Sequence, residues 1–152
     1  MEKMSRNDYF MNIAKVTAER TTCFSEPKGA VLVKENRIIS TGYTGAPNGI
    51  DSCKYEDKEC RKRKLGYGHG KGHDECKAVH AESNAILSAA LLGISTKGSI
   101  LYCTHKPCSE CTKMLIQAGI HKIYYLNDYS SKFADEMLKQ TNIEVIKYEE
   151  GC

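Results

Sequence analysis

Two short segments of this chain combine residues that bind zinc with a carboxylate. The first reads His80-Ala81-Glu82, and the second reads Pro107-Cys108-Ser109-Glu110-Cys111. A catalytic zinc site uses three protein ligands and leaves one position for water. His80, Cys108 and Cys111 would supply those ligands. Because zinc lowers the pKa of a bound water and a nearby carboxylate can carry its proton, the set predicts hydrolysis with Glu82 as the proton carrier.

Two predicted helices position these groups. Small and apolar residues run from Val79 to Leu92 at helical spacing, so we expect His80 and Glu82 in the first turn of that helix. A second helix is predicted from Cys108 to about Ala118, which places its two thiols one turn apart. A redox Cys-x-x-Cys pair is the alternative for the second segment alone, and the His80-x-Glu82 partner argues against it.

The remaining elements predict an α/β fold. Three β-rich runs are separated by helices, and a hairpin with a two-residue turn at Glu35-Asn36 precedes them. We expect a three-layer α/β/α sandwich around a mixed five-stranded sheet, formed by one domain over residues 1–152. The predicted strands are 29–34, 37–43, 99–104, 122–126 and 143–147, and the further predicted helices are about 5–20 and 133–140.

A loop follows the second strand. Its residues are Thr44, Gly45, Ala46, Pro47, Asn48 and Gly49, three of which interrupt regular structure. Such a loop is either a plain connector or part of a binding site, because loops at strand ends commonly carry function.

Residues 51–79 form a polar insertion that is rich in cysteine and glycine and shows no sustained period. A long irregular stretch is uncommon in a small domain unless something orders it. A structural zinc could do so, and the preferred ligands are Cys23, Cys53, Cys60 and Cys76, with His73 as the substitute. Reduced thiols on an exposed loop are the alternative.

Composition limits the class of protein. The chain has 152 residues, eight cysteines and a formal charge of +3. It contains no apolar run long enough for a membrane span and no secretory segment, so we expect a cytoplasmic protein in which cysteines bind metal. The basic run at 61–64 is either a solvated loop or a phosphate contact, and the modest charge suits a small anionic substrate better than nucleic acid.

The two zinc motifs and several other segments resemble the cytidine deaminase superfamily, and within it the deoxycytidylate (dCMP) deaminases. The motif His-x-Glu followed by Pro-Cys-x-x-Cys is the signature of zinc-dependent nucleobase deaminases. The resemblance covers nearly the whole chain. It rests on residues 29–31, 41–49, 79–86, 102–113 and 125–129.

This resemblance implies hydrolysis of dCMP to dUMP and ammonia, which feeds dTMP synthesis. Glu82 would move a proton from the water to the ring N3 and then to the leaving amine. Ala81 would contact the pyrimidine through its backbone, and Tyr129 would pack on the ring. Ser25 and the loop from Thr44 to Gly49 match positions near the sugar and phosphate, and Thr44 stands where the family usually has asparagine.

Further properties follow only from the resemblance. Cys23 and Cys53 match two ligands of a second, structural zinc found in some phage relatives. Many relatives are hexamers regulated by dCTP and dTTP, which implies a homo-oligomer and Mg²⁺ bound with a dCTP effector. The alternatives are a deaminase of CMP, tRNA adenosine or a free base, and a non-catalytic zinc protein of the competence type.

Overall fold

A five-stranded mixed sheet forms the centre of the molecule, as predicted. The computed structural model describes residues 3–56 and 59–151, so positions 57 and 58 of the predicted insertion lie outside the described residues. The strand order is β2-β1-β3-β4-β5, with β1 antiparallel to both neighbours and β3, β4 and β5 parallel. The strands are β1 (Gly29–Lys34), β2 (Arg37–Tyr43), β3 (Ile100–His105), β4 (Lys122–Asn127) and β5 (Glu144–Lys147).

The predicted hairpin joins β1 and β2. Its two turn residues, Glu35 and Asn36, both have positive φ values of 50° and 60°. That conformation matches the twist of the flanking strands, which is why such two-residue turns favour hairpins.

Four helices of seven or more residues occur where they were predicted. They are α1 (Arg6–Ala18), α4 (Ala81–Leu91), α5 (Ser109–Gln117) and α6 (Lys132–Leu138). Each is shorter than its prediction by one or two residues at one or both ends, because the terminal residues cap the helix instead of continuing it. Ser5, for example, precedes α1, and its side chain accepts a hydrogen bond from the N–H of Asp8.

The insertion is more regular than the sequence indicated. It contains α2 (Cys53–Glu56), α3 (Arg61–Lys64) and the 3₁₀ turn η1 (His73–Glu75). The side chains of Arg61 and Glu75 form an ion pair of 2.8 Å, which joins α3 to η1. The prediction of an entirely irregular stretch was therefore wrong, since contacts within the insertion stabilise helices too short to give a periodic pattern.

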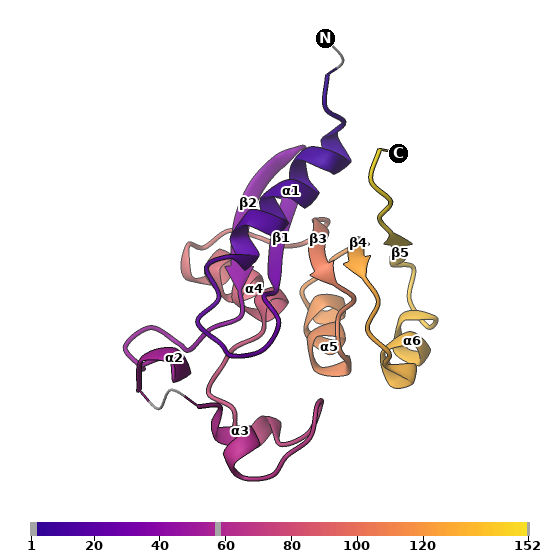
Figure 1. Cartoon of the computed structure of the whole chain (residues 1–152). Helices are drawn as coiled ribbons and strands as arrows, with labels where there is room; N and C mark the ends of the chain where they lie inside the picture. Colours follow the sequence, from indigo (N-terminus) through magenta and orange to yellow (C-terminus); the bar gives the residue numbers. More distant parts are fainter. Residues whose placement is uncertain (1–2, 57–58, 152) are drawn as a thin grey trace.

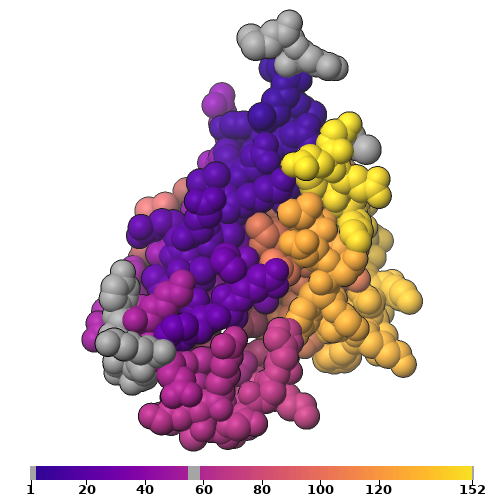
Figure 2. All heavy atoms as spheres, in the orientation of Figure 1, coloured from indigo at the N-terminus to yellow at the C-terminus, as the bar shows by residue number. Residues whose placement is uncertain are grey.

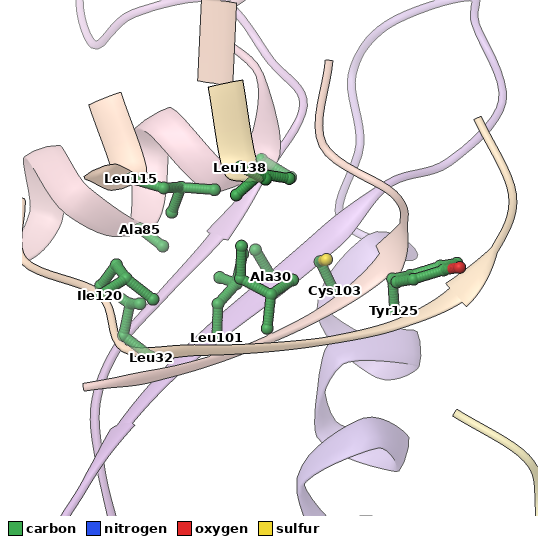
Figure 3. Close-up of a cluster of buried hydrophobic side chains, with 11 residues drawn as sticks. Ala30, Leu32, Ala85, Leu101, Cys103, Leu115, Ile120, Tyr125 and Leu138 are labelled. Atoms are coloured by element: carbon green, nitrogen blue, oxygen red, sulfur yellow. The ribbon is translucent and has the colours of Figure 1, made fainter. Parts of the chain in front are cut away.

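The sheet separates two apolar cores, and alternate residues of each strand face opposite sides. Ala30 and Leu32 face α4, α5 and α6, whereas Val31 and Val33 face α1. Figure 3 shows the first core, in which Leu115 and Leu138 from the helices lie over the strand residues. The expected three layers are visible in Figure 1 as α1 on one face of the sheet and the other three helices on the opposite face.

Gly42 sets the position of α4 against β2. A Cβ atom at this position would lie 2.2 Å from the carbonyl oxygen of Ala81 and 2.3 Å from the nitrogen of Ala85. Only a residue without a side chain allows this close approach, so Gly42 fixes the first turn of α4 on the sheet.

The insertion lies at one end of the molecule. In Figure 1 its helices α2 and α3 lie beyond the ends of the strands, and Figure 2 shows its magenta atoms forming the surface there. Within residues 3–56 and 59–151, no helix is long and apolar enough to cross a membrane.

Candidate active site

Two helix starts meet at the predicted zinc motifs. His80 is the residue before α4, and Cys108 is the residue before α5, both with extended backbone conformation. His80 therefore caps its helix and does not lie within the first turn, where we expected it. Cys111 and Glu82 lie in the first turns of α5 and α4. The positive ends of both helices favour negative charge at this point.

The three predicted zinc ligands come together. Among the described residues, the ligand atoms of His80, Cys108 and Cys111 all lie within 4.8 Å of one another. His80 Nδ1 is 3.5 Å from the sulfur of Cys108 and 3.4 Å from that of Cys111. Tetrahedral zinc at its usual bond lengths separates a sulfur and a nitrogen ligand by roughly 3.5 Å. The donor set and its spacing therefore fit zinc.

The pKa values also suit a metal ligand set. A hydrogen bond from the Cys111 thiol lowers the pKa of Cys108 to about 3, and His80 contributes in the same direction. The shared proton, together with burial, raises the pKa of Cys111. A cation that replaces this proton lets both sulfurs act as thiolates.

Glu82 is a buried carboxyl group beside the three ligands. Its side chain is 6% exposed, and its Oε2 is 3.6 Å from the sulfur of Cys111. Burial raises the pKa of Glu82 above the ordinary glutamate value. A carboxylate with a raised pKa accepts a proton more readily at neutral pH, as a general base requires.

Contacts from the loop after β2 hold the start of α4 in place. Gly45 and Val79 exchange two backbone hydrogen bonds of 3.2 and 2.8 Å. Asn84 of α4 donates to the carbonyl of Tyr43 at 2.7 Å, and the hydroxyl of Thr21 donates to the carbonyl of Thr44 at 2.6 Å. The loop thus connects the sheet edge directly to His80.

A cavity of about 240 Å³ opens onto His80, Cys108 and Glu82, whereas the buried Cys111 lies outside its lining. One side is formed by the insertion and the other by the ends of β1, β3 and β4. The remaining side chains that line it are Cys23, Ser25, Lys28, Thr44, Cys60, Lys62, Arg63, Tyr67, His69, His73, Cys76, Ala78, His105, Lys106 and Tyr129, with Gly68 and Gly70.

The predicted substrate residues divide into two groups. Ser25, Thr44 and Tyr129 line the cavity. The other residues of the loop, Gly45, Ala46, Pro47, Asn48 and Gly49, do not belong to its lining, and 47–49 are exposed. The side chain of Ala81 is buried in the core, so any contact with a ligand would involve its backbone.

The residues predicted for a second zinc gather near the same cavity. Cys23, Cys60, Cys76 and His73 line it, whereas Cys53 is buried and lies outside its lining. Burial raises the pKa of Cys53, and the nearby thiols of Cys23, Cys60 and Cys76 raise it further. In the described residues these side chains do not form a group as close as His80, Cys108 and Cys111.

Several basic residues of the cavity were not predicted as site residues. His105 and Lys106 immediately precede Pro107, and Lys28 immediately precedes β1. Lys62 and Arg63 come from the basic run at 61–64. The sequence left two alternatives open for this run: a solvated loop and a phosphate contact. The position of His105 and Lys106 beside the zinc motif was a usable signal for the first pair.

Comparisons with known proteins agree with this geometry. Residues 4–127 match the model of the cytidine and deoxycytidylate deaminase zinc-binding region. ComE operon protein 2 of Bacillus subtilis is 37% identical over 98% of this chain and 74% of its own length. The deoxycytidylate deaminase of Mycobacterium phage D29 is 35% identical over 82% of this chain and 97% of its own.

A solved structure shares the fold at nearly full length. The dCMP deaminase of cyanophage S-TIM5, in complex with dCMP and dUMP, superposes with a TM-score of 0.76 at 30% identity. The match covers 97% of this chain and 100% of that chain.

Proposed function

Since the chain belongs to the cytidine and deoxycytidylate deaminase family, we propose that it hydrolyses dCMP to dUMP and ammonia. The observation that carries the proposal is the buried Glu82 beside the set His80, Cys108 and Cys111, because Glu82, His80 and Cys108 line a cavity that also carries cationic side chains. This arrangement joins hydrolytic chemistry to recognition of an anion.

Zinc bound by the three ligands would lower the pKa of water and so supply a nucleophile at neutral pH. Glu82 would accept a proton from the attacking water, because its carboxyl group is buried and its pKa is raised, and would deliver it to the pyrimidine N3. Glu82 would then take a second proton from the hydroxyl group added at C4 and pass it to the amine, which leaves as ammonia when the C4–N bond breaks and the C4 carbonyl forms. Burial of Glu82 also keeps bulk water from competing for the proton.

The charge of the cavity favours a nucleotide over a free base. Lys28, Lys62 and Arg63 line it, and each can bind a phosphate oxygen, whereas Lys106, which also lines it, forms an ion pair of 2.7 Å with Asp135. Ser25 and Thr44 contribute hydroxyl groups suited to the sugar. Tyr129 contributes an aromatic face, over which Lys28 Nζ lies 5.9 Å from the ring centroid, and such a face can pack on a pyrimidine.

An ammonia-release assay across dCMP, CMP, deoxycytidine, guanine and tRNA tests the substrate. We expect turnover of dCMP well above that of the others. The alternative substrates would replace our proposal if one of them reacted while dCMP did not.

Glu82→Gln tests the mechanism. Loss of the proton carrier lowers turnover by about 10²- to 10⁴-fold, while the zinc content stays unchanged. Glu110→Gln is the matched control, because Glu110 follows Cys108 closely but pairs with Lys113 at the surface. Turnover by Glu82→Gln at the level of this control would contradict the mechanism.

A second, structural zinc also belongs to the proposal. Its ligands are Cys23, Cys53, Cys60 and Cys76, with His73 as the substitute. The burial of Cys23 and Cys53 and their proximity to the other thiols support it. We expect two zinc ions per chain by elemental analysis and about one in Cys53→Ser. Two ions in both proteins would count against these ligands.

Regulation and assembly are proposed on the resemblance. The enzyme would be a cytoplasmic homo-oligomer, a hexamer as in many relatives, with dCTP and Mg²⁺ as activator and dTTP as inhibitor. Exposed leucines on α4 support self-association. Substrate saturation curves with and without dCTP and Mg²⁺ test the effectors: identical curves would exclude regulation by dCTP.

A further inference from the structure

Ser83 lies directly behind the predicted zinc ligands and has no assigned role. It follows Glu82 in the first turn of α4, and its side chain is only 5% exposed. Its hydroxyl oxygen is 3.5 Å from the sulfur of Cys111 and 3.7 Å from that of Met114, both on α5. A polar group is thus buried between the two helices that carry the ligands.

The state of Cys111 determines the direction of this hydrogen bond. In the metal-free pair either atom can be the donor. A cysteine that binds zinc is a thiolate and has no proton to donate. The hydroxyl of Ser83 must then be the donor, and the thiolate of Cys111 is a better acceptor than the neutral thioether of Met114.

Cys111 needs such a donor because its surroundings are negative. It is 1% exposed, with the carboxyl of Glu82 at 3.6 Å and Cys108 as a second thiolate nearby. Among the described side chains, the contacts of its sulfur are with the other ligands, with Glu82 and with Ser83. Ser83 is therefore the neutral side-chain donor that remains when zinc occupies the site.

We propose that Ser83 is a positioning residue that donates a hydrogen bond to the Cys111 thiolate and so strengthens zinc binding. The inference rests on the proposed function only for the zinc site, not for the substrate. The bond orients the sulfur toward the metal and disperses part of its charge. Groups that bond to metal ligands in this way commonly change metal affinity by about 10- to 100-fold.

Zinc affinity measured against a competing chelator tests this role without any assay of turnover. We expect Ser83→Ala to bind zinc at the catalytic site about 10- to 100-fold more weakly than the parent protein. Ser83→Thr keeps the hydroxyl and restores most of the affinity. Ser99→Ala is the matched control, because Ser99 is a fully buried serine whose hydroxyl has no partner among the described residues.

Cobalt in place of zinc gives a second readout. Without the hydrogen bond, the sulfur donates its electrons more readily, so the thiolate-to-cobalt absorption of Ser83→Ala moves to longer wavelength. Equal zinc affinity and equal cobalt spectra in folded Ser83→Ala and parent would overturn the proposal, as would equal losses in Ser83→Ala and Ser83→Thr. Neither result depends on whether dCMP is turned over, so the proposed function stands or fails separately.

Discussion

Thr44 has a buried hydroxyl with no partner among the described residues, and it lines the cavity. Its side chain is 4% exposed. A buried polar atom without a hydrogen bond costs about 1–3 kcal/mol, so the folded protein tolerates a penalty here. That penalty is relieved if a bound sugar hydroxyl pairs with Thr44.

Thr44→Val should therefore separate stability from binding. The substitution keeps the shape and removes the unpaired oxygen, so we expect unfolding free energy to rise by about 1 kcal/mol. The KM for dCMP should rise several-fold, because the sugar loses its partner. Thermal unfolding and steady-state kinetics measure the two effects.

Thr112→Val provides the comparison for this experiment. Thr112 is also fully buried, and its hydroxyl has no partner within the described part of the chain, but it lies outside the cavity lining. Thr112→Val should raise the unfolding free energy without changing the KM for dCMP. An unchanged KM in Thr44→Val would remove Thr44 from the substrate site.

Sequence spacing was sufficient to find the site residues that lie close together along the chain. His80 and Glu82, and likewise Cys108 and Cys111, lie within one helical turn of each other, so their spacing alone brings each pair together. Lys28 could not be found in this way, because it reaches the cavity only through the packing of strands that are far apart in the chain.

At the scale of elements, the insertion closes one side of the cavity with the basic helix α3. Lys62 and Arg63 line the cavity, and the ion pair between Arg61 and Glu75 holds α3 against η1. His69 of the insertion also approaches the opposite wall of the cavity, since the centroid of its ring lies 6.1 Å from that of Tyr129. A phosphate at the wall formed by α3 would meet two cations, Lys62 and Arg63, from this short helix.

Charge reversal of these two residues tests the phosphate contact. We expect Lys62→Glu with Arg63→Glu to raise the KM for dCMP by at least about tenfold, because each charge-assisted hydrogen bond contributes about 1.5–3 kcal/mol. Deoxycytidine, which has no phosphate, should be affected little. Steady-state kinetics with both substrates at two salt concentrations measures the difference.

Lys71→Glu is the control for a charge reversal in the insertion away from the cavity. Lys71 belongs to the same insertion but is exposed and outside the cavity lining. Equal effects on dCMP and deoxycytidine in the double variant would contradict a phosphate role. A large effect of Lys71→Glu would instead indicate long-range attraction.

The strands and longer helices could be predicted because their sequence patterns are local. The short helices of the insertion could not be predicted in this way. The runs at 29–34 and 37–43 became β1 and β2 with the predicted limits. In contrast, α2 and α3 have four residues each, too few to show a period. Their order depends on contacts such as Arg61–Glu75, which no single-sequence pattern reveals.

For the whole molecule, α4 joins the active site to an apolar surface. Its inner face carries Ala81, Ala85 and Ala89, which are buried. Its outer side carries Leu87 and Leu91, which are 55% and 82% exposed, and Leu92 and Ile94 follow the helix at 68% and 37%. Soluble monomers rarely expose such a group of large apolar side chains together, so the surface fits contact with a second copy of the chain.

Leu91→Glu tests this surface, because a charge buried against leucines of another copy disfavours association. We expect the parent protein to have a mass above the 17.0 kDa of one chain by light scattering, and Leu91→Glu to associate at least about tenfold more weakly. Phe133→Glu is the control, since Phe133 is 58% exposed on α6, far from α4 in the sequence. A parent mass of one chain, or equal loss of association in both variants, would contradict an interface at α4. Because His80 immediately precedes α4 and Glu82 lies in its first turn, weaker association with reduced turnover would further indicate that neighbouring copies hold the catalytic helix in place.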